Sequence, residues 1–190
     1  MGRSNNDLKH MQNAMEALRQ RLRNDPNGDP LIWPLSGVLA YSQRPLRDHP
    51  EHSHKLETIA LDARPLIEAW IDRVQSAGIR SVICLLTPPQ LRKYEIVLGP
   101  GGLLASYHDA GFEVRHFPVF DTAHPDEREG CEELGKILFN KVHAAFLGLP
   151  KPVLLHCSAG IDRSSPVAVE IVHREGVQLF GKPTAHNAHG

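Results

Sequence analysis

The sequence contains little that would suit an exported or membrane-spanning chain. It has only three cysteines, at positions 84, 131 and 157, and so sparse and odd a number in 190 residues does not form a disulfide framework. No apolar run approaches the roughly 20 residues that cross a bilayer, and none near the N-terminus has the length of a signal peptide. We therefore expect a cytoplasmic protein with no stable membrane association.

An excess of charge of either sign is also missing. Lys and Arg together number 21 and Asp and Glu together 22, which gives a net charge of −1. Without a basic surplus the chain cannot hold nucleic acid or anionic lipid by bulk electrostatics. We therefore predict no nucleic-acid partner, and any anionic ligand must be held by local geometry.

The remaining composition is that of a globular domain. Hydrophobic residues make up 41% of the chain and charged residues 23%, which at this length suits one domain. Apolar residues at helical spacing predict a helix within residues 1–30, followed by a linker. We expect this helix to pack on the domain, and a dimerising helix is the alternative. The domain itself is predicted over residues 31–180, with a disordered tail over residues 181–190, and the oligomeric state is left open.

Strand and helix patterns alternate along the predicted domain. Strands are predicted at residues 31–35, 38–42, 79–86, 112–119 and 152–156, and helices at residues 62–77, 101–110, 126–147 and 167–175. Thr87-Pro88-Pro89 ends the third strand, and no element is predicted between it and the second helix. The alternation predicts an α/β fold with a central, mainly parallel sheet flanked by helices.

The segment after the last strand carries the clearest chemical signal, His156-Cys157-Ser158-Ala159-Gly160-Ile161-Asp162-Arg163-Ser164. Ligands of open α/β sheets bind beyond the carboxyl ends of strands, where the next helix presents unpaired N–H groups. Here such groups can surround one anion, and the guanidinium of Arg163 can hold two of its oxygens. Positive groups beside Cys157 would favour its nucleophilic thiolate. We expect this cysteine to face phosphorus, and a plain buried thiol is the alternative.

This segment resembles the HC-x5-R-S/T signature of the cysteine-dependent protein tyrosine and dual-specificity phosphatases. The resemblance implies a protein tyrosine phosphatase-like fold and a phosphomonoesterase that needs no metal or other cofactor. It implies that Cys157 forms a cysteinyl-phosphate, that Arg163 binds the phosphoryl oxygens and that Ser164 stabilises the leaving thiolate. His156 would support the loop. The phosphate would be held by the backbone N–H groups of Ser158, Ala159, Gly160, Ile161, Asp162 and Arg163.

The family also supplies a general acid from an aspartate on a separate, upstream loop. Phe117-Pro118-Val119-Phe120-Asp121-Thr122-Ala123-His124-Pro125-Asp126 resembles that loop, and Asp121 is our first choice. Asp126 is a second candidate, although an aspartate after a proline can be a helix N-cap. Asp162 is the third, because an acid there resembles the C-x4-D-R-T/S pattern of myotubularins and some bacterial lipid-active phosphatases. Otherwise we expect Asp162 to be the partner of Arg163.

The loop composition favours a protein substrate. Phosphoinositide-selective relatives carry extra lysines in the signature, where this chain has Ser158, Ala159 and Ile161. The chain is short for a classical tyrosine phosphatase, so a compact, atypical dual-specificity enzyme acting on phosphotyrosine, and on phosphoserine or phosphothreonine, fits better. The alternatives are a non-catalytic module that binds phosphoresidues, a phosphoinositide phosphatase and a sulfurtransferase.

Two weaker features remain. His49, His52 and His54 could be a metal site with a neighbouring acid, but we expect a solvated polar loop and no metal. Cys84 could form a protective disulfide with Cys157, although burial in the core is the preferred interpretation. Few residues follow the signature, so we expect the further helices that usually brace the family's loop to be missing and the N-terminal helix to be a candidate substitute.

Overall fold

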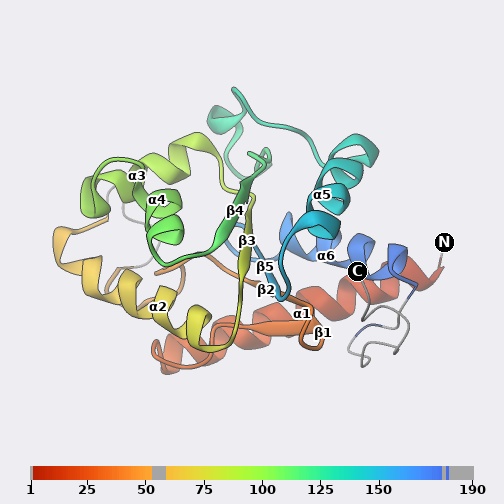
Figure 1. Ribbon diagram of the computed structural model, residues 1–190, viewed down its shortest axis with the longest axis horizontal. Helices are drawn as coiled ribbons and strands as arrows, with labels where there is room; N and C mark the ends of the chain where they lie inside the picture. Colours follow the sequence, from red (N-terminus) through yellow and green to blue (C-terminus); the bar gives the residue numbers. More distant parts are fainter. Residues whose placement is uncertain (1, 53–58, 177–178, 180–190) are drawn as a thin grey trace.

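The structure is a computed structural model that describes residues 2–52, 59–176 and 179 (Figure 1). The predicted tail at residues 181–190 and His54 lie outside the described residues. The helices are α1 (Gly2–Asn24), α2 (Arg64–Ser76), α3 (Pro88–Leu98), α4 (Gly102–Asp109), α5 (Lys136–Gly148) and α6 (Ser164–Arg174). The strands are β1 (Ile32–Leu35), β2 (Leu39–Ser42), β3 (Ser81–Cys84), β4 (Glu113–His116) and β5 (Val153–His156). Short 3-10 turns cover Leu61–Ala63 and Pro125–Glu127.

The five strands form one sheet in the order β1-β2-β5-β3-β4. Strands β2, β5, β3 and β4 run parallel, and only β1 pairs antiparallel with its neighbour β2. The predicted α/β fold with a central, mainly parallel sheet is therefore confirmed. His156 at the end of β5 lies level with Ser42 of β2 and Cys84 of β3, so the carboxyl ends of the parallel strands meet at one edge.

Two apolar layers hold the helices on the sheet. Helices α1, α5 and α6 share one buried cluster with one face of the sheet, and α2, α3 and α4 share another with the opposite face. Figure 1 shows α2, α3 and α4 on one side of the strands and α5 and α6 on the other. Neighbouring strand residues alternate between the layers, as Leu154 and Leu155 do, because successive side chains of a strand point to opposite faces.

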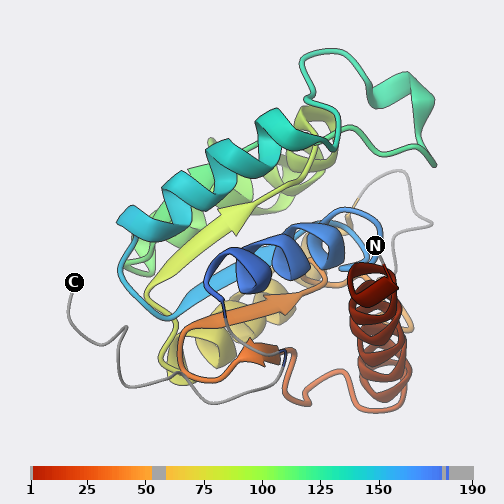
Figure 2. The ribbon, with the colours of Figure 1, turned by 90° about the vertical axis from the view of Figure 1, so that its right-hand side faces the viewer.

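Helix α1 packs inside the domain along its apolar stripe. Met11, Met15 and Leu18 are completely buried, and they share their cluster with α6, beside which α1 stands in Figure 2. The apolar stripe of this helix is therefore covered within the chain. Arg19 of the same helix binds the carboxylate of Asp48 at 2.7 Å, which ties α1 to the segment after β2.

Helix α3 was not predicted from the sequence. Thr87 is its N-cap, and its hydroxyl accepts a hydrogen bond from the backbone N–H of Gln90, whose side chain in turn accepts one from the N–H of Thr87. This reciprocal arrangement is a capping box, and prolines at the first helical positions lose no hydrogen bond there. The prolines that end β3 therefore also begin a helix.

The predicted helix over residues 126–147 was wrong in its first half. Residues 128–135 form an irregular, non-helical segment, and helix α5 starts only at Lys136. Within α5, Leu138 and Val142 are buried, whereas Ile137 is 72% exposed. None of the helices within the described residues combines the length and the apolarity that crossing a membrane requires.

Candidate active site

The signature loop, residues 157–163, joins β5 to α6 at the edge where the parallel strands end. Cys157 lies at its floor, 1% exposed, and its Sγ accepts a hydrogen bond from the backbone N–H of Gly160 at 3.2 Å. Gly160 has a φ of +77°, and a Cβ added there would lie 2.7 Å from Cε of Met15 in α1. Only glycine fits this position without strain. The close packing of Met15 in α1 against the loop therefore depends on Gly160, and so does the turn that directs the N–H at the sulfur.

Further hydrogen bonds fix the backbone of the loop. The N–H of Arg44 donates to the carbonyl of Ser158 at 3.0 Å, and the hydroxyl of Ser165 donates to the carbonyl of Gly160 at 2.8 Å. Ser164, at the start of α6, is completely buried, and its hydroxyl has no hydrogen-bond partner among the described residues. The contact to the sulfur that we expect of Ser164 is therefore absent from this state.

Arg163 is only 2% exposed, and the hydrogen-bond partners of its guanidinium lie upstream in the chain. Nη1 donates to the carbonyls of Leu85 and Val119 and to Oε1 of Gln90, each at 3.2 Å. Nη2 donates to the carboxylate of Asp121 at 2.6 Å. The partner of Arg163 is thus Asp121, and our expectation of Asp162 in that place was wrong.

The three aspartates considered as general acid lie in different surroundings. Asp121 has a side chain only 12% exposed and touches the guanidinium of the signature loop. Asp162 is exposed on the loop itself and lines the adjoining pocket, whereas Asp126 is exposed in a 3-10 turn and does not line it. The geometry therefore favours Asp121 among the three.

The segment that carries Asp121, residues 117–135, is closed into a loop by two backbone hydrogen bonds. Phe120 donates to the carbonyl of Glu132 and Glu132 donates to the carbonyl of Pro118, both at 2.7 Å. The hydroxyl of Thr87 also donates to the carboxylate of Glu127 at 2.8 Å, which anchors the loop to the start of α3. The aspartate is thus held by its own loop and by a helix that we did not predict.

His156 is a buried, neutral support for the residue that follows it. Burial lowers its pKa to about 3, against the weaker opposing effect of a hydrogen bond with the carbonyl of Cys157. Burial also holds the pKa of Tyr107 well above its usual value, so the phenol keeps its proton and donates it to Nε2 of His156 at 3.1 Å. Nδ1 then carries the ring proton and faces the carbonyl of Cys157 at 3.4 Å, which orients the backbone of Cys157.

A pocket of about 100 Å³ opens beside the signature loop. Ser158, Ala159 and Asp162 of the loop line it together with Asp121, and Arg44, Gln90 and Tyr94 complete the wall on the other sides. Arg44, Gln90, Tyr94 and Tyr107 were not identified as site residues from the sequence. For Gln90 a signal existed, because a threonine followed three positions later by glutamine is the pattern of a capping box.

Cys84 packs as a core residue. It is completely buried in the layer of α2, α3 and α4, whereas Cys157 belongs to the layer of α1, α5 and α6, and both thiols are free. Burial raises the pKa of Cys84 to about 12, so its thiol stays protonated at neutral pH. These facts favour the core interpretation over a protective disulfide.

The histidine cluster gives no metal site within the described part of the chain. There the side chains of His, Cys, Asp and Glu form no group of three or more that could hold a metal ion. The rings of His49 and His52 lie 5.1 Å apart, and Asp48 is bound by arginines of α1.

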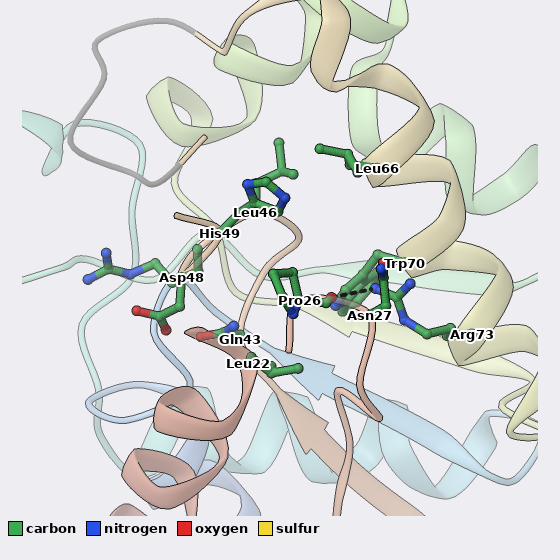
Figure 3. A pocket seen from close by; sticks show the side chains of 11 residues that line it. Leu22, Pro26, Asn27, Gln43, Leu46, Asp48, His49, Leu66, Trp70 and Arg73 are labelled. Atoms are coloured by element: carbon green, nitrogen blue, oxygen red, sulfur yellow. Dashed lines mark hydrogen bonds between the residues drawn. The ribbon is translucent and has the colours of Figure 1, made fainter. Parts of the chain in front are cut away.

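His49 instead lines a second hollow of about 30 Å³, between the end of α1 and helix α2. In Figure 3, Arg73 reaches the carbonyl of Pro26 at this hollow, and Asp48 is another of the residues that line it. The volume suffices for about two water molecules, so this hollow is too small for a substrate.

The fold and the signature loop define a class, the dual-specificity phosphatases of the protein tyrosine phosphatase-like fold. Residues 58–175 match the family model described as Cyclin-dependent kinase inhibitor 3 (CDKN3), and the chain belongs to that family. The resemblance seen in the sequence is therefore confirmed. Helix α1 and strands β1 and β2 lie outside the matched residues.

Among solved structures, kinase associated phosphatase (KAP), with a substitution of its catalytic site cysteine to a serine, is similar in fold. The match has a TM-score of 0.50 and 17% sequence identity, and it covers 72% of this chain and 65% of that one. This chain therefore spans just under two thirds of that structure, and the likeness supports the fold alone. No protein in the curated collection is significantly similar to the chain.

Proposed function

We propose that this chain is a metal-independent phosphomonoesterase that hydrolyses phosphotyrosine, and phosphoserine or phosphothreonine, in proteins. The observation that carries the proposal is the 2.6 Å contact between Asp121 and Arg163. It brings a carboxyl group from a loop distant in sequence to the loop that holds Cys157. A nucleophile, an anion-binding group and a proton donor would thereby lie close together, next to the pocket that Asp121 lines.

The chemistry would proceed in two steps. The thiolate of Cys157 attacks phosphorus, and the bond to the substrate oxygen breaks with its electron pair going to that oxygen, which takes a proton from the carboxyl of Asp121. Water then attacks the cysteinyl-phosphate and returns a proton to Asp121. Inorganic phosphate and the thiolate are released.

The surrounding groups would stabilise the charge that develops on the phosphoryl oxygens. The guanidinium of Arg163 and the backbone N–H groups from Ser158 to Arg163 are the donors for these oxygens. The hydroxyl of Ser164, which lacks a partner in this state, would bind the sulfur as it leaves phosphorus. His156 would act by positioning the backbone and would not exchange protons.

The names of the relatives suggest the class of partner. Both the family description and the similar solved structure refer to kinases, so a phosphorylated protein kinase is a reasonable substrate to test first. The cysteines of this chain are free, which fits a reducing compartment such as the cytoplasm.

Turnover of a generic aryl phosphate in EDTA tests the proposal. We expect the intact protein to release phosphate in the chelator and the Cys157→Ser variant to release none. The second candidate function is a module that binds phosphoresidues without cleaving them, because Arg163 is fully satisfied by protein groups in this state. Tight phosphopeptide binding without turnover by the intact protein would favour that candidate.

A further inference from the structure

Arg44 is a buried cation at the active-site pocket, and no carboxylate among the described residues forms an ion pair with it. Its residue is 8% exposed, and it follows β2 directly, on the edge of the sheet where the signature loop lies. Its side chain donates to the carbonyl of Pro45 at 3.1 Å, to the hydroxyl of Tyr94 at 3.0 Å and to the hydroxyl of Ser158 at 3.4 Å. All three partners are neutral.

The contrast with the other buried arginine of the site is informative. Arg163 is 2% exposed and binds the carboxylate of Asp121, whereas Arg44 makes no ion pair with any described residue. A buried charge without a counter-ion is costly, and such sites persist where a ligand supplies the missing charge. Arg44 is held rigidly, because Tyr94 also donates to the carbonyl of Pro45 at 2.7 Å.

Two further cations line the same pocket. Lys93 precedes Tyr94 on α3, is half-buried, and makes no hydrogen bond or ion pair with the part of the chain that the structure describes. Arg47 lies three residues after Arg44, and its pKa is lowered to about 10 by burial and by repulsion from Arg19 and Arg44. An anion bound here would relieve that repulsion.

None of the acidic residues that line the pocket makes an ion pair with Arg44 or Lys93. The carboxylate of Asp121 is bound to Arg163, and that of Glu127 accepts the hydroxyl of Thr87 on the loop that carries Asp121. Asp162 is exposed on the signature loop. Arg44 lies on the segment after β2 and Lys93 on α3, and the hydrogen bond from Arg44 to Tyr94 joins these two elements.

We propose that Arg44 and Lys93 form a second anion subsite beside the signature loop, which binds a further negative group on the phosphorylated substrate. The side chain of Arg44 touches Ser158, so this subsite adjoins the place where the cleaved phosphate would sit. The preferred substrate is then a phosphopeptide with a second phosphoresidue, or an Asp or Glu, close to the residue that is cleaved. The inference rests on the proposed phosphatase function for its substrate class.

The test compares three versions of one phosphotyrosine peptide, whose neighbouring residue is glutamine, glutamate or phosphothreonine. We expect kcat/KM for phosphotyrosine cleavage to rise in that order, by about 10-fold or more in total, because charge-assisted hydrogen bonds are the strong ones. Lys93→Gln and Arg44→Gln should reduce this ratio, and Lys93→Arg should restore it. Arg92→Gln, an exposed neighbour on α3 that does not line the pocket, should leave the ratio unchanged.

Binding separates a failure of this inference from a failure of the proposed function. Affinities of the three peptides are measured with the Cys157→Ser variant, so the order of binding is known even if the intact protein turns over no substrate. Equal affinities and equal kcat/KM for the three peptides would overturn the subsite. The subsite would also be overturned if Arg44→Gln and Lys93→Gln left the ratio of kcat/KM between the phosphothreonine and glutamine peptides unchanged. Arg44 would then serve only the cleaved phosphate. Faster turnover of vesicles containing a bisphosphorylated phosphoinositide than of every peptide would replace the peptide by a lipid.

Discussion

The carboxylate of Asp121 and the guanidinium of Arg163 form an ion pair at 2.6 Å, at a point where both side chains are almost completely buried. In the proposed mechanism Asp121 donates a proton to the leaving oxygen and Arg163 binds the phosphoryl oxygens. In this state the two residues are therefore bound to each other at the place where the substrate would bind. A phosphoryl group that binds Nη2 of Arg163 displaces the carboxylate of Asp121, which must then take up a proton from solvent before it can protonate the leaving oxygen.

The first prediction concerns this competition. Asp121→Ala removes the group that occupies Nη2 of Arg163, so inorganic phosphate should bind the variant more tightly, by roughly 3- to 10-fold, as expected for an ion pair of about 1 kcal/mol. Titration calorimetry measures the affinity directly. An affinity equal to or below that of the unchanged protein would show that Asp121 and phosphate do not compete.

The second prediction concerns proton donation. Asp121→Ala should lower kcat for phosphotyrosine peptides by about 100-fold or more, because a poor leaving group needs a proton in the transition state. An aryl phosphate with a strongly acidic phenol should lose much less activity, since its leaving group departs unprotonated. The exposed Asp126 provides the control, and Asp126→Ala should behave as the unchanged protein does. Undiminished phosphotyrosine turnover in Asp121→Ala would assign the acid to Asp162 or Asp126.

The third prediction follows from the burial of His156. Its pKa is about 3 in the folded chain, because burial disfavours the charged ring, whereas an unfolded histidine titrates near pH ~6.5. Between these values the unfolded chain binds a proton that the folded chain does not. The free energy of unfolding therefore falls as the pH drops below about 6.5, with a share of at most about 1.4 kcal/mol per pH unit from this residue.

Urea denaturation at several values between pH 7 and pH 4 measures this share. The curve of His156→Gln should be flatter than that of the unchanged protein, while the variant is less stable at pH 7 because Tyr107 loses its partner. His108→Gln, on the exposed side of α4, is the control and should leave the slope of the stability curve unchanged. Parallel curves for the unchanged protein and His156→Gln would contradict a neutral, buried ring.

The fourth prediction concerns the contact between α1 and the signature loop. Gly160→Ala combines an unfavourable φ with a clash against Met15, so it should cost about 1–3 kcal/mol of stability and should lower kcat, because the N–H no longer points at Sγ of Cys157. Gly111→Ala is a matched control: its φ is +84° and the added Cβ meets nothing within 4 Å. Gly160→Ala combined with Met15→Ala should recover part of the loss in kcat. Equal effects of Gly160→Ala and Gly111→Ala would show that Met15 does not brace the loop.

Much of this arrangement could be predicted from the sequence because the relevant patterns are local. The sheet, the helix stripe of α1 and the strand–loop–helix around Cys157 each follow from the spacing of apolar residues within one short segment. The segment at residues 128–135 could not be distinguished from a helix, because its apolar residues continue the helical spacing of α5. The structure turns Ile137 outward, and this outcome depends on where α5 meets the sheet.

The parts of the site that escaped prediction depend on contacts between distant segments. Arg44 is a cation in a polar stretch, and only its burial against Tyr94 distinguishes it from other surface arginines. Likewise the ion pair of Asp121 with Arg163 joins residues 42 positions apart. The nearer acid, Asp162, was the natural choice of partner on sequence distance alone, but a side chain next to Arg163 in the loop points elsewhere.

Direct detection of the phosphorylated nucleophile is the measurement closest to the central claim. The intact protein is mixed with an aryl phosphate, quenched in acid within milliseconds, and digested for mass spectrometry. The account predicts one added phosphoryl group on the peptide that contains Cys157, formed at a rate at least equal to kcat and absent from Cys157→Ser. Steady turnover with no phosphoryl group on that peptide, or unchanged turnover in Cys157→Ser, would contradict it.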